Sequence, residues 1–330
     1  MSQEQRDYYK ARYQTLEDIP SVGPATATKL RKLGFKTVEA LATAPVRFLT
    51  QNGFGEDTAK KMVAAARKGI ALEFITAADL HEIHKNKQKM TTGCSTLDRL
   101  LNGGLETISI TELYSEFGGG KSQICQQLAV TVQLPEAEGG LDGGCLYLDT
   151  EHVFRPSRVM KIAEHVGLDP AAVLQRIIYA EAYTSEHQAQ LLENADEVIK
   201  ENNIRLIIID SLTGHFRSEY LGRENLAPRQ QRLNQHMHKL IRLARVFNAV
   251  AIVTNQVSAT PDSFFVGKAP TAVGGNIVGH IAHTRIFLRK GSHNQRIAKI
   301  VASPFLPEGE TPFRITAEGI VGTELEEAIP

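Results

Sequence analysis

At 330 residues the chain is too long for one small core, so we expect two domains, one of them large. A hydrophobic content of 42% is ordinary for a soluble protein, and no apolar run approaches membrane-spanning length, which predicts a cytoplasmic protein with no membrane partner. A formal net charge of zero argues against a uniformly basic nucleic-acid binder, and three scattered cysteines lack the spacing of a metal or redox site.

Residues 1–70 predict a small all-α N-terminal domain. The tight turn Val22-Gly23-Pro24 sets Pro24 at a helix start, where its missing N–H does no harm. This layout is typical of a helix-hairpin-helix, whose turn offers backbone N–H groups to a DNA phosphate without reading bases. A weaker second copy follows at residues 52–61. A helical interaction module that does not touch DNA explains the same pattern.

Residues 71–90 have the composition of a linker, with a polar run from His84 to Lys89. Phe74 stands in this polar segment with Ala77 three residues later. A lone aromatic side chain in such a context either docks on a partner surface or packs on its own domain.

Residues 91–330 alternate strand and helix patterns, which predicts an α/β domain with a mostly parallel twisted sheet. A final pair of strands flanks a short turn at 291–294 and predicts an antiparallel hairpin that extends the sheet. The expected strands are 108–114, 145–149, 177–182, 205–210, 249–254, 284–289 and 296–301.

Three glycines, Gly118 to Gly120, lie between the first of these strands and a helix pattern, and Lys121 and Ser122 follow them. Such a turn lets consecutive backbone N–H groups face phosphate oxygens, with the positive end of the helix behind them. Lys121 then reaches the β- and γ-phosphates and Ser122 binds Mg²⁺, so the pattern predicts an ATP and Mg²⁺ site. Ser115 occupies the place where this motif has its first glycine. A glycine-rich turn with a surface lysine is the plain alternative.

Two acids follow buried strands. Asp210 ends the apolar run 206–209, which is typical of an acid that shares Mg²⁺ with Ser122. Glu151 comes at the carboxyl end of strand 145–149, where it is placed to polarise the water that attacks the γ-phosphate. Spacing alone equally allows Glu151 to cap a helix.

Two segments, 217–229 and 257–275, lack periodicity and are predicted to be long loops. Between Arg223 and Arg245 there are six Lys or Arg against one acid, and between Arg285 and Lys299 there are five with none. Basic residues, backbone amides and the aromatic pair Phe264 and Phe265 suit contact with single-stranded nucleic acid.

Taken together, the motifs resemble those of the RecA-like strand-exchange recombinases, and of the archaeal RadA proteins in particular, from about residue 16 to residue 322. The matching motifs include Phe74-x-x-Ala77, Glu116-Phe117-Gly118-x-Gly120-Lys121-Ser122-Gln123, Asp149-Thr150-Glu151, Arg158, Arg223, Arg229, Thr254-Asn255-Gln256-Val257, Gly274-Gly275, His280 and Pro307.

This resemblance implies a RecA-like P-loop ATPase core that forms a filament or ring on single-stranded DNA and pairs it with duplex DNA. It implies Glu151, Lys121 and Gln256 as catalytic residues, Ser122 and Asp210 as metal ligands, and Phe74 and Ala77 as oligomerisation residues. The implied DNA-binding residues are Arg223, Arg229, Phe264, Phe265, Gly274 and Gly275. The implied nucleotide-binding residues are Glu116, Phe117, Gly118, Gly119, Gly120, Lys121, Ser122, Gln123, Arg158, His280 and Pro307.

The chain departs from the family pattern at Ser115, at His152 and Val153 after the catalytic acid, and at Ala302. In the family, an acid at the last position helps bind a monovalent ion or Ca²⁺ beside the phosphates, so the departure bears on any use of K⁺. These changes keep open a recombination mediator that binds DNA and a recombinase but hydrolyses little ATP. A ring helicase of the same fold is a third alternative.

Overall fold

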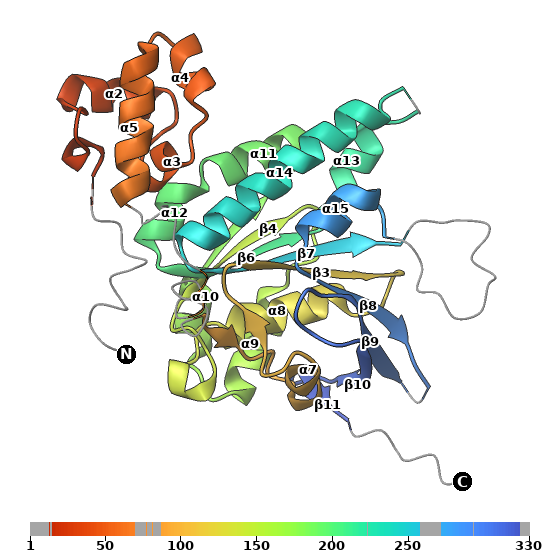
Figure 1. Cartoon of the computed structure of the whole chain (residues 1–330). Coiled ribbons are helices and arrows are strands. Elements are labelled where there is room, and N and C mark those ends of the chain that lie inside the picture. Colours follow the sequence, from red (N-terminus) through yellow and green to blue (C-terminus); the bar gives the residue numbers. More distant parts are fainter. Residues whose placement is uncertain are drawn as a thin grey trace.

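The computed structural model describes residues 13, 15–69, 77, 81, 87–222, 224–257, 272–292 and 294–323. Figure 1 shows a small group of helices from the N-terminal part of the chain beside a larger body in which helices cover a central sheet. The predicted combination of an all-α N-terminal unit and an α/β core is therefore confirmed.

The N-terminal unit has a hydrophobic core of its own, formed by residues between Leu16 and Ala66. Pro24 is the first residue of its helix, as predicted, and Gly23 caps that helix. The second hairpin also forms, with Gly53 at φ 81° between two helices. Lys29 connects the two hairpins, because its Nζ donates to the carbonyl of Gly53 at 2.7 Å. The helices are η1 (Leu16–Asp18), α2 (Pro24–Lys32), α3 (Val38–Ala42), α4 (Val46–Gln51) and α5 (Glu56–Gly69).

The core contains, within the described residues, a 9-stranded sheet in the order β11-β10-β9-β8-β3-β7-β6-β4-β5. Strands β3 to β8 run parallel and β9 to β11 antiparallel. The parallel strands are β3 (Ser109–Ser115), β4 (Gly144–Asp149), β5 (Ile177–Glu181), β6 (Ile204–Asp210), β7 (Val250–Gln256) and β8 (Thr284–Lys290). The antiparallel strands are β9 (Gln295–Ala302), β10 (Gly309–Ile315) and β11 (Ile320–Gly322). All predicted strands are present, and β10 and β11 are additional.

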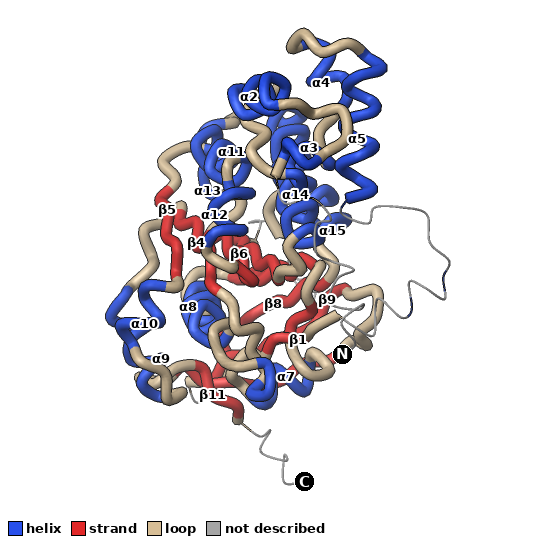
Figure 2. Tube along the Cα trace, turned by 90° about the vertical axis from the view of Figure 1, so that its left-hand side faces the viewer, coloured by secondary structure: helices blue, strands red, loops and turns tan. Residues whose placement is uncertain are grey.

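Helices cover both faces of this sheet, which is why its central strands β3 and β4 are buried along their whole length (Figures 1 and 2). One face carries α7 (Ser95–Leu100), α8 (Lys121–Thr131), α9 (Pro156–His165) and α10 (Pro170–Gln175). The other carries α11 (Ser185–Glu193), α12 (Ala195–Glu201), α13 (Gly214–Glu219), α14 (Leu226–Val246) and α15 (Gly275–Ile281). A short pair, β1 (Lys89–Met90) and β2 (Leu105–Glu106), and the turn η2 (Glu136–Glu138) complete the core.

The predicted long loop 217–229 is wrong in extent. Residues 214–219 form α13 and residues from Leu226 onward form α14, so the connection spans only 220–225. Pro228 lies in the first turn of α14, where the helix needs no hydrogen bond from its nitrogen. Polar residues follow at 229–232, partly buried or exposed, so this part of the helix shows no apolar periodicity in the sequence.

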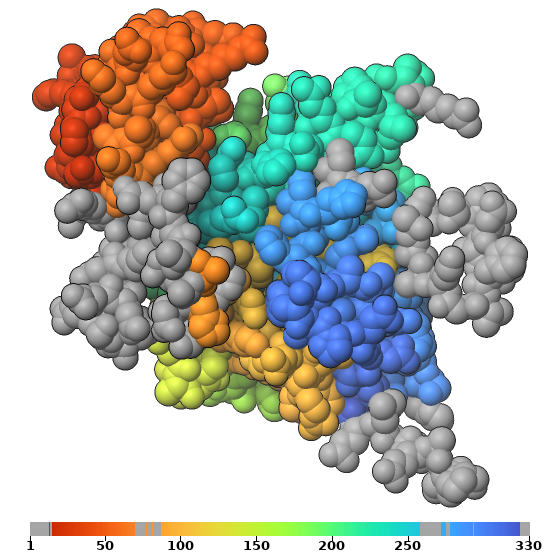
Figure 3. All heavy atoms as spheres, in the orientation of Figure 1, coloured from red at the N-terminus to blue at the C-terminus, as the bar shows by residue number. Residues whose placement is uncertain are grey.

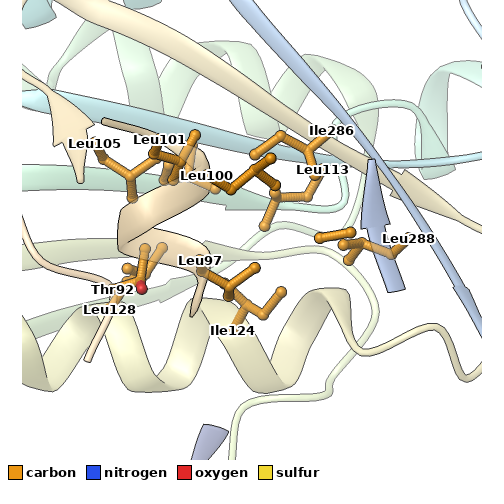
Figure 4. Close-up of a pocket in the computed structure, with 12 residues that line it drawn as sticks. Thr92, Leu97, Leu100, Leu101, Leu105, Leu113, Ile124, Leu128, Ile286 and Leu288 are labelled. Atoms are coloured by element: carbon orange, nitrogen blue, oxygen red, sulfur yellow. The ribbon is translucent and has the colours of Figure 1, made fainter. Parts of the chain in front are cut away.

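Beneath α8 the core leaves a small apolar cavity of about 20 Å³ (Figure 4). Residues that line it include Leu97, Leu101, Leu113, Ile124, Leu128 and Ile286. A ligand pocket generally measures about 300–1,000 Å³ and offers several polar groups. This cavity is therefore a packing feature of the core and does not bind a substrate.

The N-terminal unit contacts the core through an ion pair, in which Lys36 Nζ lies 2.8 Å from Glu197 Oε2 of α12. Both side chains are nearly half exposed, so water and salt screen the pair and it contributes little. In the space-filling view the N-terminal helices stand as a separate lobe at the upper left (Figure 3). Among the described residues, no helix is both long and apolar enough to cross a membrane.

His236 on α14 predicts a pH dependence of stability. The side chain is 4% exposed, and burial lowers its pKa from 6.5 to about 4. The unfolded chain therefore binds a proton that the folded chain rejects, so the free energy of unfolding falls as pH drops from about 6.5 towards 4, by up to about 3 kcal/mol. Urea unfolding at a series of pH values measures this loss.

The variant His236→Gln should lose this part of the pH dependence. His238→Gln, at an exposed position of the same helix, is the matched control and should retain it. Equal pH profiles for the wild type and His236→Gln would contradict the assignment.

Candidate functional site

The glycine-rich turn connects β3 to α8, as predicted. Gly118 and Gly120 adopt φ values of 79° and 106°, which L side chains rarely tolerate. A Cβ on Gly119 would lie 2.3 Å from Ser115 Oγ, so this position has no room for a side chain either. Each glycine of the turn is thus required by the local geometry. The backbone forms the kind of concave turn that accepts phosphate oxygens.

Ser115 ends strand β3 and is not among the residues with positive φ, so its backbone is unstrained. Its Oγ accepts a hydrogen bond from Lys121 Nζ at 2.8 Å and donates one to the carbonyl of Glu116. Burial lowers the pKa of Lys121, against the opposing effect of Asp210 and Glu151. The ammonium group is therefore held over the turn by Ser115, in a place where a further negative group would stabilise its charge.

Asp210 and Ser122 lie together, since the Asp210 carboxylate accepts a hydrogen bond from the Ser122 side chain. It also accepts from Thr254 Oγ1 at 2.5 Å and from the Tyr147 hydroxyl at 2.9 Å. Burial raises the pKa of Asp210, and these three hydrogen bonds oppose that rise. Among the described residues, no group of three His, Cys, Asp or Glu side chains is arranged to hold a metal ion. One carboxylate and one hydroxyl fit Mg²⁺, which keeps several waters and takes phosphate oxygens.

Glu151 lies in the turn that follows β4, and Asp149 shapes this turn by accepting from the N–H groups of Glu151 and Phe154. Glu151 Oε1 accepts from Ser211 Oγ at 2.6 Å and lies 3.4 Å from Gln256 Nε2. The next helix, α9, has Arg155 as its cap, so Glu151 is not a helix cap. The structure thus brings two of the predicted catalytic residues, Glu151 and Gln256, into contact.

Arg158 lies on α9 beside the first turn of α8. Its Nε donates to Gln123 Oε1 at 2.9 Å, and its Nη1 donates to the carbonyl of Ala317. Its Nη2 is buried without a hydrogen-bond partner, and burial lowers the pKa of the guanidinium. Arg158 therefore leaves one donor available next to the predicted nucleotide position. Phe117, another predicted nucleotide-binding residue, is 96% exposed at the tip of the turn.

Other predicted residues lie away from this cluster. His280 is exposed on α15, across the sheet from α8, and Pro307 is exposed between β9 and β10. Arg229 lies in the first turn of α14, and Gly274, at φ 94°, caps α15, which begins at Gly275. Ala77 is described and exposed. Four predicted residues fall outside the described part of the chain: Phe74, Arg223, Phe264 and Phe265.

Sequence patterns assigned no role to several polar groups of the site. Ser211, Tyr147 and Thr254, the last known only as part of a matching motif, donate hydrogen bonds to the two acids. They come from strands or turns that are distant in sequence. Ser211 and Thr254 each stand at the carboxyl end of a predicted strand, which is the signal that would have found them. Tyr147 lies inside an apolar strand, and nothing in the sequence distinguishes it from an ordinary core residue.

Two of the departures noted in the sequence change this site. His152 adopts φ 56°, and its Nδ1 lies 3.1 Å from Glu181 Oε1 on β5. Ala302 ends β9, pairs with Arg285 in the sheet and is exposed. It offers no side-chain oxygen to a cation.

Comparisons with known proteins agree with this geometry. A protein-family model described as Rad51 matches residues 84–323, and a second, described as a SAM-like helix-hairpin-helix tandem, matches residues 13–68. The DNA repair and recombination protein RadA of Aeropyrum pernix is 48% identical over 312 residues, which cover 94% of this chain and 98% of that protein.

The contact between Ser115 and Lys121 leads to a prediction for nucleotide binding. The Ser115 hydroxyl takes one of the three N–H donors of Lys121, which is then not free for a phosphate oxygen. A hydrogen bond to a charged group contributes about 1.5–3 kcal/mol. We expect Ser115→Ala to bind ATP more tightly than the wild type, by at least about threefold, in isothermal titration calorimetry.

Ser109→Ala is the matched control, because Ser109 is a buried serine at the other end of the same strand. It should leave the ATP affinity unchanged. Weaker ATP binding by Ser115→Ala would contradict the proposed competition for Lys121.

Proposed function

The chain belongs to the Rad51 family, and from this premise we propose that it is an ATP-dependent DNA recombinase. It assembles on single-stranded DNA, exchanges strands with a homologous duplex and hydrolyses ATP in response to DNA. The division into an N-terminal domain to residue 70, a linker to residue 90 and an ATPase core to residue 330 is part of this proposal.

One observation carries the proposal further than the glycine-rich turn alone. Gln256 lies 3.4 Å from Glu151 and is the last residue of β7, directly before the segment expected to contact DNA. The Gln256 side chain therefore connects Glu151, beside the expected nucleotide, to the beginning of that segment. Such a connection is required if the bound nucleotide is to control the affinity for DNA.

The residues of the site divide the work of hydrolysis. The N–H groups of the turn from Gly118 to Gly120 and the ammonium of Lys121 bind phosphate oxygens. Glu151 accepts a proton from the attacking water, and its hydrogen bond from Ser211 fixes the carboxylate for that role. Arg158 and Gln123 bind the adenine base of ATP. Glu116, Phe117 and Gln256 complete the pocket.

Ser122 and Asp210 would hold Mg²⁺, which neutralises charge on the phosphates when it is bound. Asp210 is pre-oriented for this by Thr254 and Tyr147. We propose no requirement for K⁺, because Ala302 supplies no oxygen at the position where the family has an acid.

Further residues of the proposed site come from a second copy of the chain. The exposed positions of His280 and Pro307, away from the turn, support their action on the nucleotide of a neighbouring subunit. Strand β5 stands at one end of the strand order in the described sheet, so its outer edge is open to a segment from a neighbouring subunit. We assign that segment to the linker with Phe74 and Ala77.

DNA binding is assigned to the segments that follow β6 and β7. They carry Arg223 and Arg229 in one case, and Phe264, Phe265 and the Gly274–Gly275 pair in the other. Arginines supply phosphate contacts, and aromatic rings supply stacking that tolerates any base. The N-terminal hairpin at Gly23 and Pro24 is proposed to contact the backbone of duplex DNA.

A second candidate is a recombination mediator with weak ATP hydrolysis. It is favoured by His152, the residue after Glu151, whose side chain contacts Glu181. It is also favoured by the hydrogen bond that Lys121 donates to Ser115. Single-turnover hydrolysis with and without single-stranded DNA separates the two functions. Stimulation by DNA supports the recombinase, and a rate that DNA leaves unchanged supports the mediator.

Lys121→Ala should abolish ATP-driven strand exchange, because Lys121 directly follows the glycine-rich turn and its half-buried ammonium lies over that turn. A strand-exchange assay between labelled single-stranded and duplex oligonucleotides measures this loss. Lys161→Ala, at an exposed position of α9, should keep the wild-type rate. An unchanged rate in Lys121→Ala would show that this site does not drive exchange.

Glu151→Gln should bind ATP with about the wild-type affinity and lower the hydrolysis rate by about 10²–10⁴-fold, since the amide cannot take a proton from water. Ser211→Ala should lower the rate less, because it removes only the hydrogen bond that orients Glu151. Quenched-flow measurement of phosphate release tests both variants. A Glu151→Gln rate near that of the wild type would assign the general base to another residue.

A further inference from the structure

Asn255 makes four hydrogen bonds through one buried side chain. It lies on β7 next to Gln256 and is 0% exposed. Its Nδ2 donates to Glu112 Oε1 at 2.8 Å and to the carbonyl of Val273 at 2.6 Å. Its Oδ1 accepts from Thr213 Oγ1 at 2.7 Å and from the Gln256 N–H at 2.9 Å. An asparagine amide has capacity for two donated and two accepted bonds, so all of it is used.

Three of these partners, Thr213, Gln256 and Val273, lie at the bases of the segments assigned to DNA. Thr213 caps α13 and so begins the stretch that leads to Arg229. Val273 lies beyond the other segment, whose base is closed by the Val273 N–H donating to the carbonyl of Gln256 at 2.9 Å and by a bridge between Val257 and Ala272. Asn255 therefore joins the beginning of one segment to both ends of the other.

Glu112 anchors Asn255 to the sheet. The Glu112 side chain is fully buried on β3, and its second oxygen accepts from Arg285 Nε at 2.6 Å. The guanidinium of Arg285 lies over the Tyr114 ring, at 5.4 Å, and Tyr114 packs with Ala272 and Phe287. A buried ion pair held in this way has one favourable geometry, because any shift leaves charge unpaired in the core.

We propose that Asn255 is a positioning residue that couples Gln256 to the described bases of the two segments assigned to DNA, at Thr213 and at Val273. This inference rests on the proposed function and deepens it. Gln256 senses the nucleotide through Glu151, and the amide of Asn255 passes its position to Val273 and Thr213. The ion pair of Glu112 with Arg285 fixes the Asn255 side chain to strand β3.

The substitution Asn255→Asp isolates this role. It keeps the size of the side chain and both accepted hydrogen bonds, and it removes the two donated ones. It also sets a carboxylate beside that of Glu112, in a site where two like charges repel strongly. The base of the second segment is thereby released, while the glycine-rich turn keeps all of its own contacts.

The test compares the affinity for fluorescein-labelled oligo-dT, measured by anisotropy, in the presence of a non-hydrolysable ATP analogue and of ADP. The ratio of the two dissociation constants reports the coupling between nucleotide and DNA, and about 5–150-fold is usual for coupled sites. We expect a wild-type ratio in this range and an Asn255→Asp ratio within about twofold of one. The stimulation of ATP hydrolysis by DNA should fall in parallel.

Gln133→Glu is the matched control. Gln133 is a buried amide whose Nε2 donates to the carbonyls of Ala129 and Val173, far from both segments. This variant should be destabilised and should keep the wild-type ratio, which separates coupling from general loss of stability. Thr213→Val removes one hydrogen bond to Asn255 without changing side-chain size and should give an intermediate ratio, so the test does not depend on the folding of Asn255→Asp.

A wild-type ratio in folded Asn255→Asp or in Thr213→Val would overturn the inference and leave the proposed function standing. A ratio of one in the wild type itself would overturn the proposed function, and this inference with it.

Discussion

The parallel register of the sheet is the constraint on which the site depends. Ser115 at the end of β3 pairs with Gln256 of β7, and Asp149 of β4 pairs with Asp210 of β6. The carboxyl ends of these strands therefore lie at one edge of the sheet, and the chain leaves that edge through turns and helix starts. Shifting any of these strands by one residue would turn its terminal side chain to the opposite face.

The chemistry at this edge follows from burial of opposite charges. Burial lowers the pKa of Lys121 and raises that of Asp210, so both groups are pushed towards their neutral forms. Hydrogen bonds from Ser122, Thr254 and Tyr147 oppose the rise in the pKa of Asp210, and the Ser115 hydroxyl accepts a hydrogen bond from the Lys121 ammonium. The proposed triphosphate and Mg²⁺ would add negative charge beside Lys121 and positive charge beside Asp210. The site is thus built to favour its ligand electrostatically.

The sequence predicts this edge well where the signal is local. The strand expected at 108–114 is observed as Ser109–Ser115, and the glycine-rich turn is at the expected place. Strand β10 was missed because Pro312 and charged residues interrupt its apolar alternation. The hydrogen bonds of Asn255 were not predicted, for another reason. Its partners Glu112 and Thr213 come from other elements, and only the folded sheet brings them together.

The central claim is that nucleotide binding controls assembly of this chain on single-stranded DNA. The most direct measurement is sedimentation velocity of the protein with a long oligo-dT, with ATP and without nucleotide. The account predicts large, cooperative protein–DNA assemblies that require ATP and dissociate when ATP is exhausted. A protein that sediments as a single subunit on DNA, whichever nucleotide is supplied, would contradict it.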